Sequence, residues 1–315
     1  MSRAFAFARF GLLLGARKLF IVTAVAFSVW CEVSASGQVT PAQRGKKIYI
    51  SVDMEGISGV SNSEQTGNRG SEYAHARKLM AEDVNAAIRG AIEGGASDIL
   101  VNDAHGNGLN LQIEDLHPAA RLLSQPLKPY GMMQGLDETF DAAMFIGFHA
   151  KAESPVGVFA HTQNGNIRDV QINGRSVGEG GMDAMYAAWH GVPVVLVTGD
   201  QVAVAQVKEI ATNARGVMTK RALNSRTVEL RPLADVRKEI QAAAREAVIA
   251  AKRATPERTG PFRIQIRYHT TEIPEVAEAL PGIERPAPDV LAFSSPSMAD
   301  AFRLYRVLYR HINPQ

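Results

Sequence analysis

Residues 48–56, with the sequence IYISVDMEG, combine a short apolar run with two carboxylates and a glycine. Such a run is typical of a strand that is buried on both faces of a parallel sheet. Asp53 and Glu55 follow the run directly. In open α/β sheets, ligands bind just outside the carboxyl ends of the strands. This stretch therefore predicts a parallel α/β sheet and a site at its edge.

Two further apolar runs, at 99–102 and 142–148, end shortly before His105 and His149. Between the first two runs, apolar residues recur at helical spacing over 73–91, and Gly94-Gly95 provides a helix stop. After these runs, we expect a polar strand near 169–172, a helix over 182–189 and a strand over 192–197. This alternation predicts a mostly parallel sheet with flanking helices on both faces.

The chain changes character after about residue 217. An alanine-rich helix is expected over 236–252, and apolar and polar residues alternate over 262–268, which predicts a strand with one polar face. A last helix is expected from Ser297, with Asp300 in a capping position. We interpret this part as a smaller C-terminal α/β subdomain, so the expected domains are a metal-binding α/β domain at 46–215 and the subdomain at 216–315.

The N-terminal segment 1–35 has the pattern of a secretory signal peptide. Four basic residues precede the apolar run LFIVTAVAFSVW, and Val33-Ser34-Ala35 fits a cleavage site for small residues. The apolar run has 12 residues, and a membrane-spanning helix needs about 20. Export to the periplasm or the medium is therefore expected, and an uncleaved N-terminal anchor is the alternative.

Composition limits the partners of the mature protein. Removal of 1–35 takes away four basic residues and one acidic residue from totals of 34 and 32, which leaves a net charge of −1. Nothing in this balance favours nucleic acid or a charged membrane surface. The only cysteine, Cys31, lies in the signal segment, so any metal must be held by nitrogen and oxygen ligands.

Asp53 and Glu55 are the first candidate metal ligands. If the strand continues through both, their side chains point to the same face, because side chains alternate along a strand. Two adjacent carboxylates resist joint ionisation unless they share a cation. A pair of divalent ions removes this conflict, with one carboxylate bridging them. The competing interpretation is a solvated aspartate and a helix-capping glutamate, since acidic residues are common in turns.

Three histidines and one more glutamate complete the candidate site. His105 lies in the loop NDAHGNG, His149 ends the run MFIGFHA, and Glu179 precedes an expected helix start. Each alone has an ordinary structural explanation, but together with the Asp-x-Glu pair they favour a metal site. His161, in GVFAHTQNGN, is a candidate proton carrier or oxyanion donor. The weaker candidates, in turns, on helix surfaces or at element ends, are His75, His117, His190, His269 and His311.

Five segments resemble, in the same order, those of the zinc-dependent D-aminopeptidases of the DppA type. They are SVDMEGISGV, VNDAHG, FIGFHAKA, GVFAHT and VGEGGMDA. The resemblance implies two zinc ions per subunit, held at the positions of Asp53, Glu55, His105, His149 and Glu179. It also implies a catalytic role, described as nucleophilic, for the position of His161. A ring-stacked decamer that encloses the active sites is implied as well.

The expected function is an exported dinuclear zinc aminopeptidase that releases N-terminal residues, D-amino acids among them, from short peptides. Metal-activated water would attack the carbonyl, and His161 would stabilise the oxyanion or carry a proton. Two alternatives stay open: a dinuclear metal amide hydrolase of other specificity, such as an L-aminopeptidase or an amidase, and a periplasmic protein that only binds metal or peptide.

Overall fold

The computed structural model describes residues 45–312. These described residues belong to one compact unit. The predicted signal peptide at 1–35 lies outside the described residues. Among the helices of the described part of the chain, none is long and apolar enough to cross a membrane.

A six-stranded sheet carries the site, in the order β3-β2-β1-β4-β7-β8. Every neighbouring pair in it is parallel. All seven residues of β4 are buried, as expected for an apolar strand in the middle of a parallel sheet. The strands are β1 (Lys46–Val52), β2 (Ala96–Asp103), β3 (Ala120–Leu123), β4 (Ala142–Phe148), β7 (Val194–Gly199) and β8 (Arg215–Met218).

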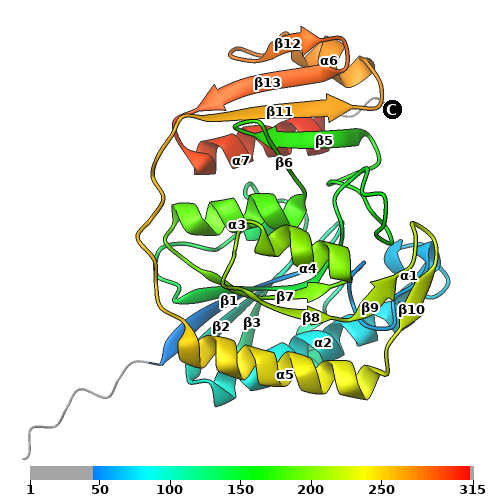
Figure 1. Ribbon diagram of the computed structural model, residues 1–315, viewed down its shortest axis with the longest axis vertical. Helices are drawn as coiled ribbons and strands as arrows, with labels where there is room; N and C mark the ends of the chain where they lie inside the picture. Colours follow the sequence, from blue (N-terminus) through cyan, green and yellow to red (C-terminus); the bar gives the residue numbers. More distant parts are fainter. Residues whose placement is uncertain (1–44, 313–315) are drawn as a thin grey trace, which may run out of the picture. The chain divides into compact units, whose positions relative to one another are not determined.

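Helices cover both faces of this sheet, and alternate residues of β1 show how. Ile48, Ile50 and Val52 pack with α2 (Tyr73–Glu93) and α5 (Leu233–Ala250) in one apolar cluster. Tyr49 faces the other way and belongs to the cluster that includes α3. Figure 1 shows α2 and α5 on one side of the sheet, and α3 (Glu179–Trp189) and α4 (Gln201–Lys208) on the other. The mostly parallel sheet with flanking helices is therefore confirmed.

A second sheet has five antiparallel strands in the order β12-β13-β11-β5-β6. α7 (Met298–Arg306) packs against β11 and β13 on one side and against α3 on the other (Figure 1). Alternate residues Ile264, Ile266 and Tyr268 of β11 are buried, which is the two-residue period expected there. The strands are β5 (Ile167–Ile172), β6 (Arg175–Val177), β11 (Phe262–Tyr268), β12 (Glu284–Ala287) and β13 (Val290–Ser295).

The expected domain boundary between residues 215 and 216 does not separate the two sheets, because elements from each side of it pack with the other side. β5 and β6 precede that boundary but pair in the antiparallel sheet, whereas α5 follows it and packs on α2. The expectation that 169–172 belongs to the parallel sheet is wrong, because its polar alternate residues suit a sheet with only one buried face. The smaller elements are α1 (Ser63–Thr66), α6 (Glu272–Ala277), the hairpin of β9 (Lys220–Ala222) and β10 (Val228–Leu230), two 3-10 helices at Ile113–Asp115 and Gly131–Met133, and a π-helical segment at Val307–His311.

Most predicted elements are present with shifted ends. α3 begins at Glu179 and not at residue 182, because Gly180 and Gly181 are accepted inside its first turn. The strand expected over 192–197 runs over Val194–Gly199, and the helix expected over 236–252 runs over Leu233–Ala250. The side chain of Ser297 caps α7 by accepting a hydrogen bond from the Asp300 amide, so that helix begins where the capping pattern predicts.

Candidate metal centre

The candidate residues gather where three neighbouring strands end together. Val52, the last residue of β1, pairs with Asp103 of β2 and with Ile146 of β4. The carboxyl ends of the three strands therefore lie at one edge of the sheet. Asp53 directly follows β1, and His149 directly follows β4. This placement agrees with the expected position of the site outside the strand ends.

Asp53 and Glu55 lie in a turn and not in the strand, so the condition for a shared strand face is not met. The turn still brings both carboxylates inward, because it packs closely on the end of β4. The Asp53 amide donates to the Ile146 carbonyl at 2.8 Å, and the Gly56 amide donates to the Gly147 carbonyl at 2.7 Å. A Cβ atom at Gly56 would lie 2.1 Å from the Phe148 carbonyl oxygen. Glycine is therefore required for this approach.

His105 faces both carboxylates of that turn. Its Nδ1 lies 3.1 Å from Oδ1 of Asp53 and 3.0 Å from Oε2 of Glu55. Asp103, at the end of β2, accepts hydrogen bonds from the amides of Asn110 and Leu111, which fixes the loop that carries His105. The loop thus holds an imidazole nitrogen against two buried carboxylates.

His149 faces the other oxygen of Asp53. Its Nε2 lies 3.3 Å from Oδ2 of Asp53 and 3.4 Å from Oε1 of Glu179, the first residue of α3. The same Glu179 oxygen lies 3.7 Å from Nε2 of His161 and accepts a hydrogen bond from the Gln163 amide at 2.5 Å. Asp53 therefore stands between two histidines, with one carboxylate oxygen toward each.

Each of the three histidines uses its remaining ring nitrogen on a backbone carbonyl. His105 Nε2 lies 2.9 Å from the Thr66 oxygen, His149 Nδ1 lies 2.9 Å from the Ala150 oxygen, and His161 Nδ1 lies 2.8 Å from the Phe159 oxygen. A carbonyl only accepts, so each of these nitrogens carries the hydrogen. The other nitrogen, which faces the carboxylates, is then the one available to a metal ion, and this is the arrangement that metal-binding histidines adopt.

In this site, burial and the nearby opposite charges shift the pKa values of the carboxylates and histidines in opposite directions. Burial disfavours the charged form of Glu55, but His105 and the other histidines nearby hold the pKa of Glu55 well below its usual range. Burial likewise opposes protonation of His105, yet Glu55 and Asp53 raise its pKa well above the ordinary value. The pKa of His149 is raised in the same way, mainly by Glu179.

The chemistry of the donor set fits a metal. Among the described residues, Oδ2 of Asp53, Oε2 of Glu55 and Nε2 of His149 are buried without a hydrogen-bond partner. Unpaired buried polar atoms are costly unless they coordinate an ion. Two groups with mutually close donor atoms share His149: one adds Asp53 and Glu55, and the other adds His161 and Glu179. Nitrogen and carboxylate oxygen donors of this kind suit zinc.

Some functional residues escaped the sequence analysis. The carbonyls of Thr66, Ala150 and Phe159 orient the histidines, but backbone acceptors leave no signal in side-chain chemistry. Asp183, one helical turn after Glu179, is also buried in this region, and its four-residue spacing from Glu179 is a signal that pointed to the same helix face. His269, by contrast, is exposed and takes no part in either donor group.

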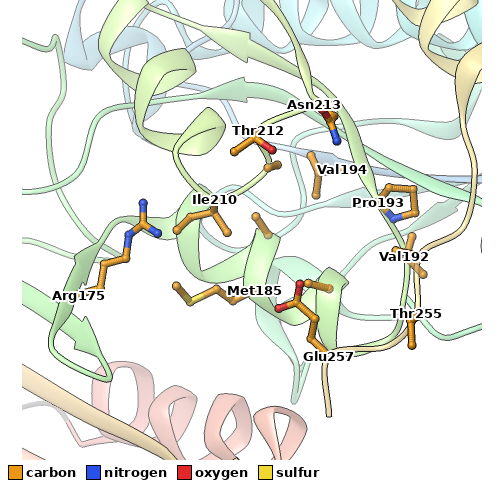
Figure 2. A pocket seen from close by; sticks show the side chains of 14 residues that line it. Arg175, Met185, Val192, Pro193, Val194, Ile210, Thr212, Asn213, Thr255 and Glu257 are labelled. Atoms are coloured by element: carbon orange, nitrogen blue, oxygen red, sulfur yellow. The ribbon is translucent and has the colours of Figure 1, made fainter. Parts of the chain in front are cut away.

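A cavity of about 360 Å³ lies elsewhere (Figure 2). Met185 of α3, Ile210, Pro193 and Glu257 contribute to its lining, and none of the six candidate site residues does. It is therefore separate from the metal centre, and we assign no chemistry to it.

Comparisons with known proteins agree with this geometry. The family model described as D-aminopeptidase, peptidase M55, matches residues 46–307. The curated D-aminopeptidase of Bacillus subtilis (strain 168) is 39% identical over 183 residues, which are 58% of this chain and 66% of that protein. The match thus spans just under two thirds of that relative's length.

A solved structure with the same fold is the zinc-dependent D-aminopeptidase DppA from Bacillus subtilis, described as a self-compartmentalizing protease. It has a TM-score of 0.79 and 33% identity, and the match covers 84% of this chain and 97% of that one. The resemblance found in the five sequence segments is confirmed. Because the family match extends over most of the sequence, the chain belongs to the peptidase M55 family of D-aminopeptidases.

Proposed function

We propose that this chain is a dinuclear zinc D-aminopeptidase that releases N-terminal residues from short peptides. The observation that carries the proposal is the position of Asp53, whose Oδ1 faces His105 and whose Oδ2 faces His149. A carboxylate between two separate imidazoles is suited to bridge two ions. Glu55 would complete the donor set on the side of His105, and Glu179 would complete it on the side of His149.

The bound zinc ions would polarise the scissile carbonyl and lower the pKa of a water molecule. The protein residues supply the rest. His161 has a side chain that is 32% exposed, compared with 2% for His149, so it can reach a substrate from the open side. Its Nδ1 is anchored on the Phe159 carbonyl, which directs Nε2 toward the centre. We assign His161 to stabilisation of the oxyanion or to proton delivery to the leaving amine.

The test is hydrolysis of D-alanyl and L-alanyl p-nitroanilides by the purified protein, with and without a chelator. We expect hydrolysis of the D-substrate, its loss on chelation and its recovery when zinc is returned. Preference for the L-substrate would make the protein an L-aminopeptidase, and hydrolysis of other amides alone would make it an amidase. Zinc binding without hydrolysis of any of these substrates would leave a binding protein.

We also propose that the protein is exported. The support is the basic, apolar and small-residue pattern of segment 1–35, with Val33 and Ala35 at the −3 and −1 positions of a cleavage site. N-terminal sequencing of material from the periplasm or the medium is expected to begin near Ser36. Full-length chain in the membrane fraction would instead indicate an anchored enzyme.

A homo-oligomeric assembly is the last part of the proposal. The solved relative is described as self-compartmentalizing, and this chain has the same fold. Most soluble oligomers are closed, symmetric homo-oligomers. A chamber around the metal centre would admit short peptides and exclude folded proteins. We extend this assembly, including a decamer, to the present chain.

A further inference from the structure

Asp183 is a buried carboxylate with no structural partner. Its residue is 1% exposed, and among the described residues neither of its carboxylate oxygens has a hydrogen-bond partner. It lies on α3, four residues after Glu179. Residues four apart on a helix are neighbours on one face, with Cβ atoms about 5–6 Å apart. Asp183 therefore lies next to the metal centre.

The carboxylate lines a small enclosed cavity. The space inside admits the centre of a water-sized group over about 10 Å³, which is room for about one such group. Gln163, Tyr305, Tyr309 and Arg306 also line it, and the Arg306 guanidinium donates to the Tyr309 hydroxyl and not to Asp183. The Gln163 amide is the group that donates to Glu179, so the cavity borders the metal centre. The hydroxyl of Tyr305 is a second buried polar atom without a partner in the described part of the chain.

Structural stability does not explain this arrangement. A buried carboxylate without hydrogen bonds costs free energy, and a neutral residue of the same size would be less costly. Burial and the nearby Glu179 and Asp53 carboxylates raise the pKa of Asp183 well above its usual range, which is a further sign of a poorly solvated group. Buried polar groups of this kind are completed by an ordered water, an ion or a ligand, or they have a catalytic role.

We propose that Asp183 binds the free α-ammonium group of the substrate. An ammonium group has the size of a water molecule, carries a positive charge, and has hydrogens for the Asp183 oxygens and the Tyr305 hydroxyl. This inference rests on the proposed function, because it explains why the protein would act only at an amino terminus. It also assigns recognition of the amine to the protein and not to the metal ions alone.

The spacing agrees with this role. In a substrate, the α-nitrogen and the scissile carbonyl carbon are separated by two bonds, or about 2.5 Å. An ammonium group held at Asp183 leaves the carbonyl within reach of the metal centre, because the Cβ atoms of Asp183 and Glu179 are about 5–6 Å apart. A peptide with a blocked amine would leave the Asp183 carboxylate buried and unpaired, so it would bind poorly.

The test uses two zinc-binding ligands that differ only in the amine, D-alanine hydroxamate and propionohydroxamate. Their dissociation constants are measured by calorimetry with the zinc-loaded protein and with D183N. We expect wild type to prefer the amine-bearing ligand by about 10–100-fold, the range for hydrogen bonds to charged groups. D183N should lose this preference, keep its affinity for propionohydroxamate and keep its zinc. The control variant D98N, at a half-exposed position of β2, should behave as wild type.

Equal binding of the two ligands by wild type, or an unchanged preference in D183N, would overturn the assignment. D183N should also unfold at a temperature no lower than wild type, whereas a structural role would lower it. If D183N does not fold, the same comparison is made with Y305F. Loss of the Tyr305 hydroxyl should reduce the preference for the amine-bearing ligand. Absence of p-nitroanilide hydrolysis by wild type would reject the proposed function. The hydroxamate comparison would still test whether Asp183 binds the amine.

Discussion

The imidazole rings of His149 and His161 stack on each other, with centroids 4.0 Å apart and planes inclined by 11°. Both Nε2 atoms face the same Glu179 oxygen, His149 at 3.4 Å and His161 at 3.7 Å. Only His149 also faces Asp53. The two rings are thus parallel neighbours with unequal surroundings, which allows their roles to be separated by experiment.

We expect His149→Ala to remove zinc and activity together, because it deletes the one imidazole shared by both donor groups. His161→Ala should retain zinc and lower kcat by roughly 10²-fold, the scale of lost acid–base or oxyanion assistance. Zinc content by atomic absorption and kcat on the D-alanyl substrate measure the two effects. Loss of zinc from His161→Ala would show that His161 is a ligand and not only a catalytic group.

Asp53→Ala tests the bridging position directly. The Asp53 carboxylate reaches both His105 and His149, so its removal should lower the zinc content from about two ions per chain and abolish hydrolysis. Asp98→Ala, at a half-exposed position of β2, is the matched control and should keep both ions. A zinc content of one ion or none in the active wild-type protein would reject the dinuclear centre.

The parallel sheet was predictable because its strands are short apolar runs followed by polar residues. The run over 142–148 coincides with β4, and its seven residues are all buried. The antiparallel sheet was not predictable as a unit, because β5 and β11 are far apart in the sequence and their pairing has no local signal. Sequence periodicity describes the faces of one strand, whereas the choice of partner depends on tertiary packing.

For the site, the residue types and their places at strand ends were enough to select six side chains that the structure brings together. The strand end expected at Val52 is correct, so the shared strand face considered for Asp53 and Glu55 does not apply, and a turn delivers both. That turn depends on the close approach of Gly56 to the end of β4, a contact between distant segments. The carbonyls that orient the histidines were also beyond prediction, because every residue has one.

Removal of zinc should stop hydrolysis without unfolding the protein. The two apolar clusters lie on the faces of the parallel sheet, and none of the candidate metal ligands belongs to them. Chelation should therefore leave the far-ultraviolet circular dichroism spectrum unchanged at 25 °C. It should lower Tm by on the order of 10 °C, as expected for loss of a tightly bound ligand. Loss of secondary structure on chelation would mean that zinc is required for folding.

Lys128 should make stability depend on pH in the alkaline range. Burial lowers the pKa of its ammonium to about 8, although Asp103 acts in the opposite direction. The folded state then holds fewer protons than the unfolded state between about pH 8 and the ordinary lysine pKa near 10.4, so the free energy of unfolding should rise with pH in this window. Its contribution is complete above the unfolded pKa and is lost as the pH falls through the folded pKa.

The measurement compares wild type with Lys128→Met in urea unfolding from pH 7 to pH 10.5. Other groups titrate in the same range, so only the difference between the two proteins reports on Lys128. We expect wild type to gain stability relative to the variant as the pH rises. A constant difference over the whole range would show that Lys128 has an ordinary pKa in the folded protein.

Assembly gives the last prediction. If this chain forms a closed chamber, light scattering on the protein from Ser36 onward should give a mass many times that of one chain, which is 34.0 kDa for the full sequence. The near-neutral charge of the mature sequence does not oppose self-association. A chamber also predicts a size filter, so di- and tripeptides should be hydrolysed and an unfolded long polypeptide with a D-residue at its amino terminus should not. A mass near that of one chain, with equal activity on both substrates, would reject both the assembly and the filter.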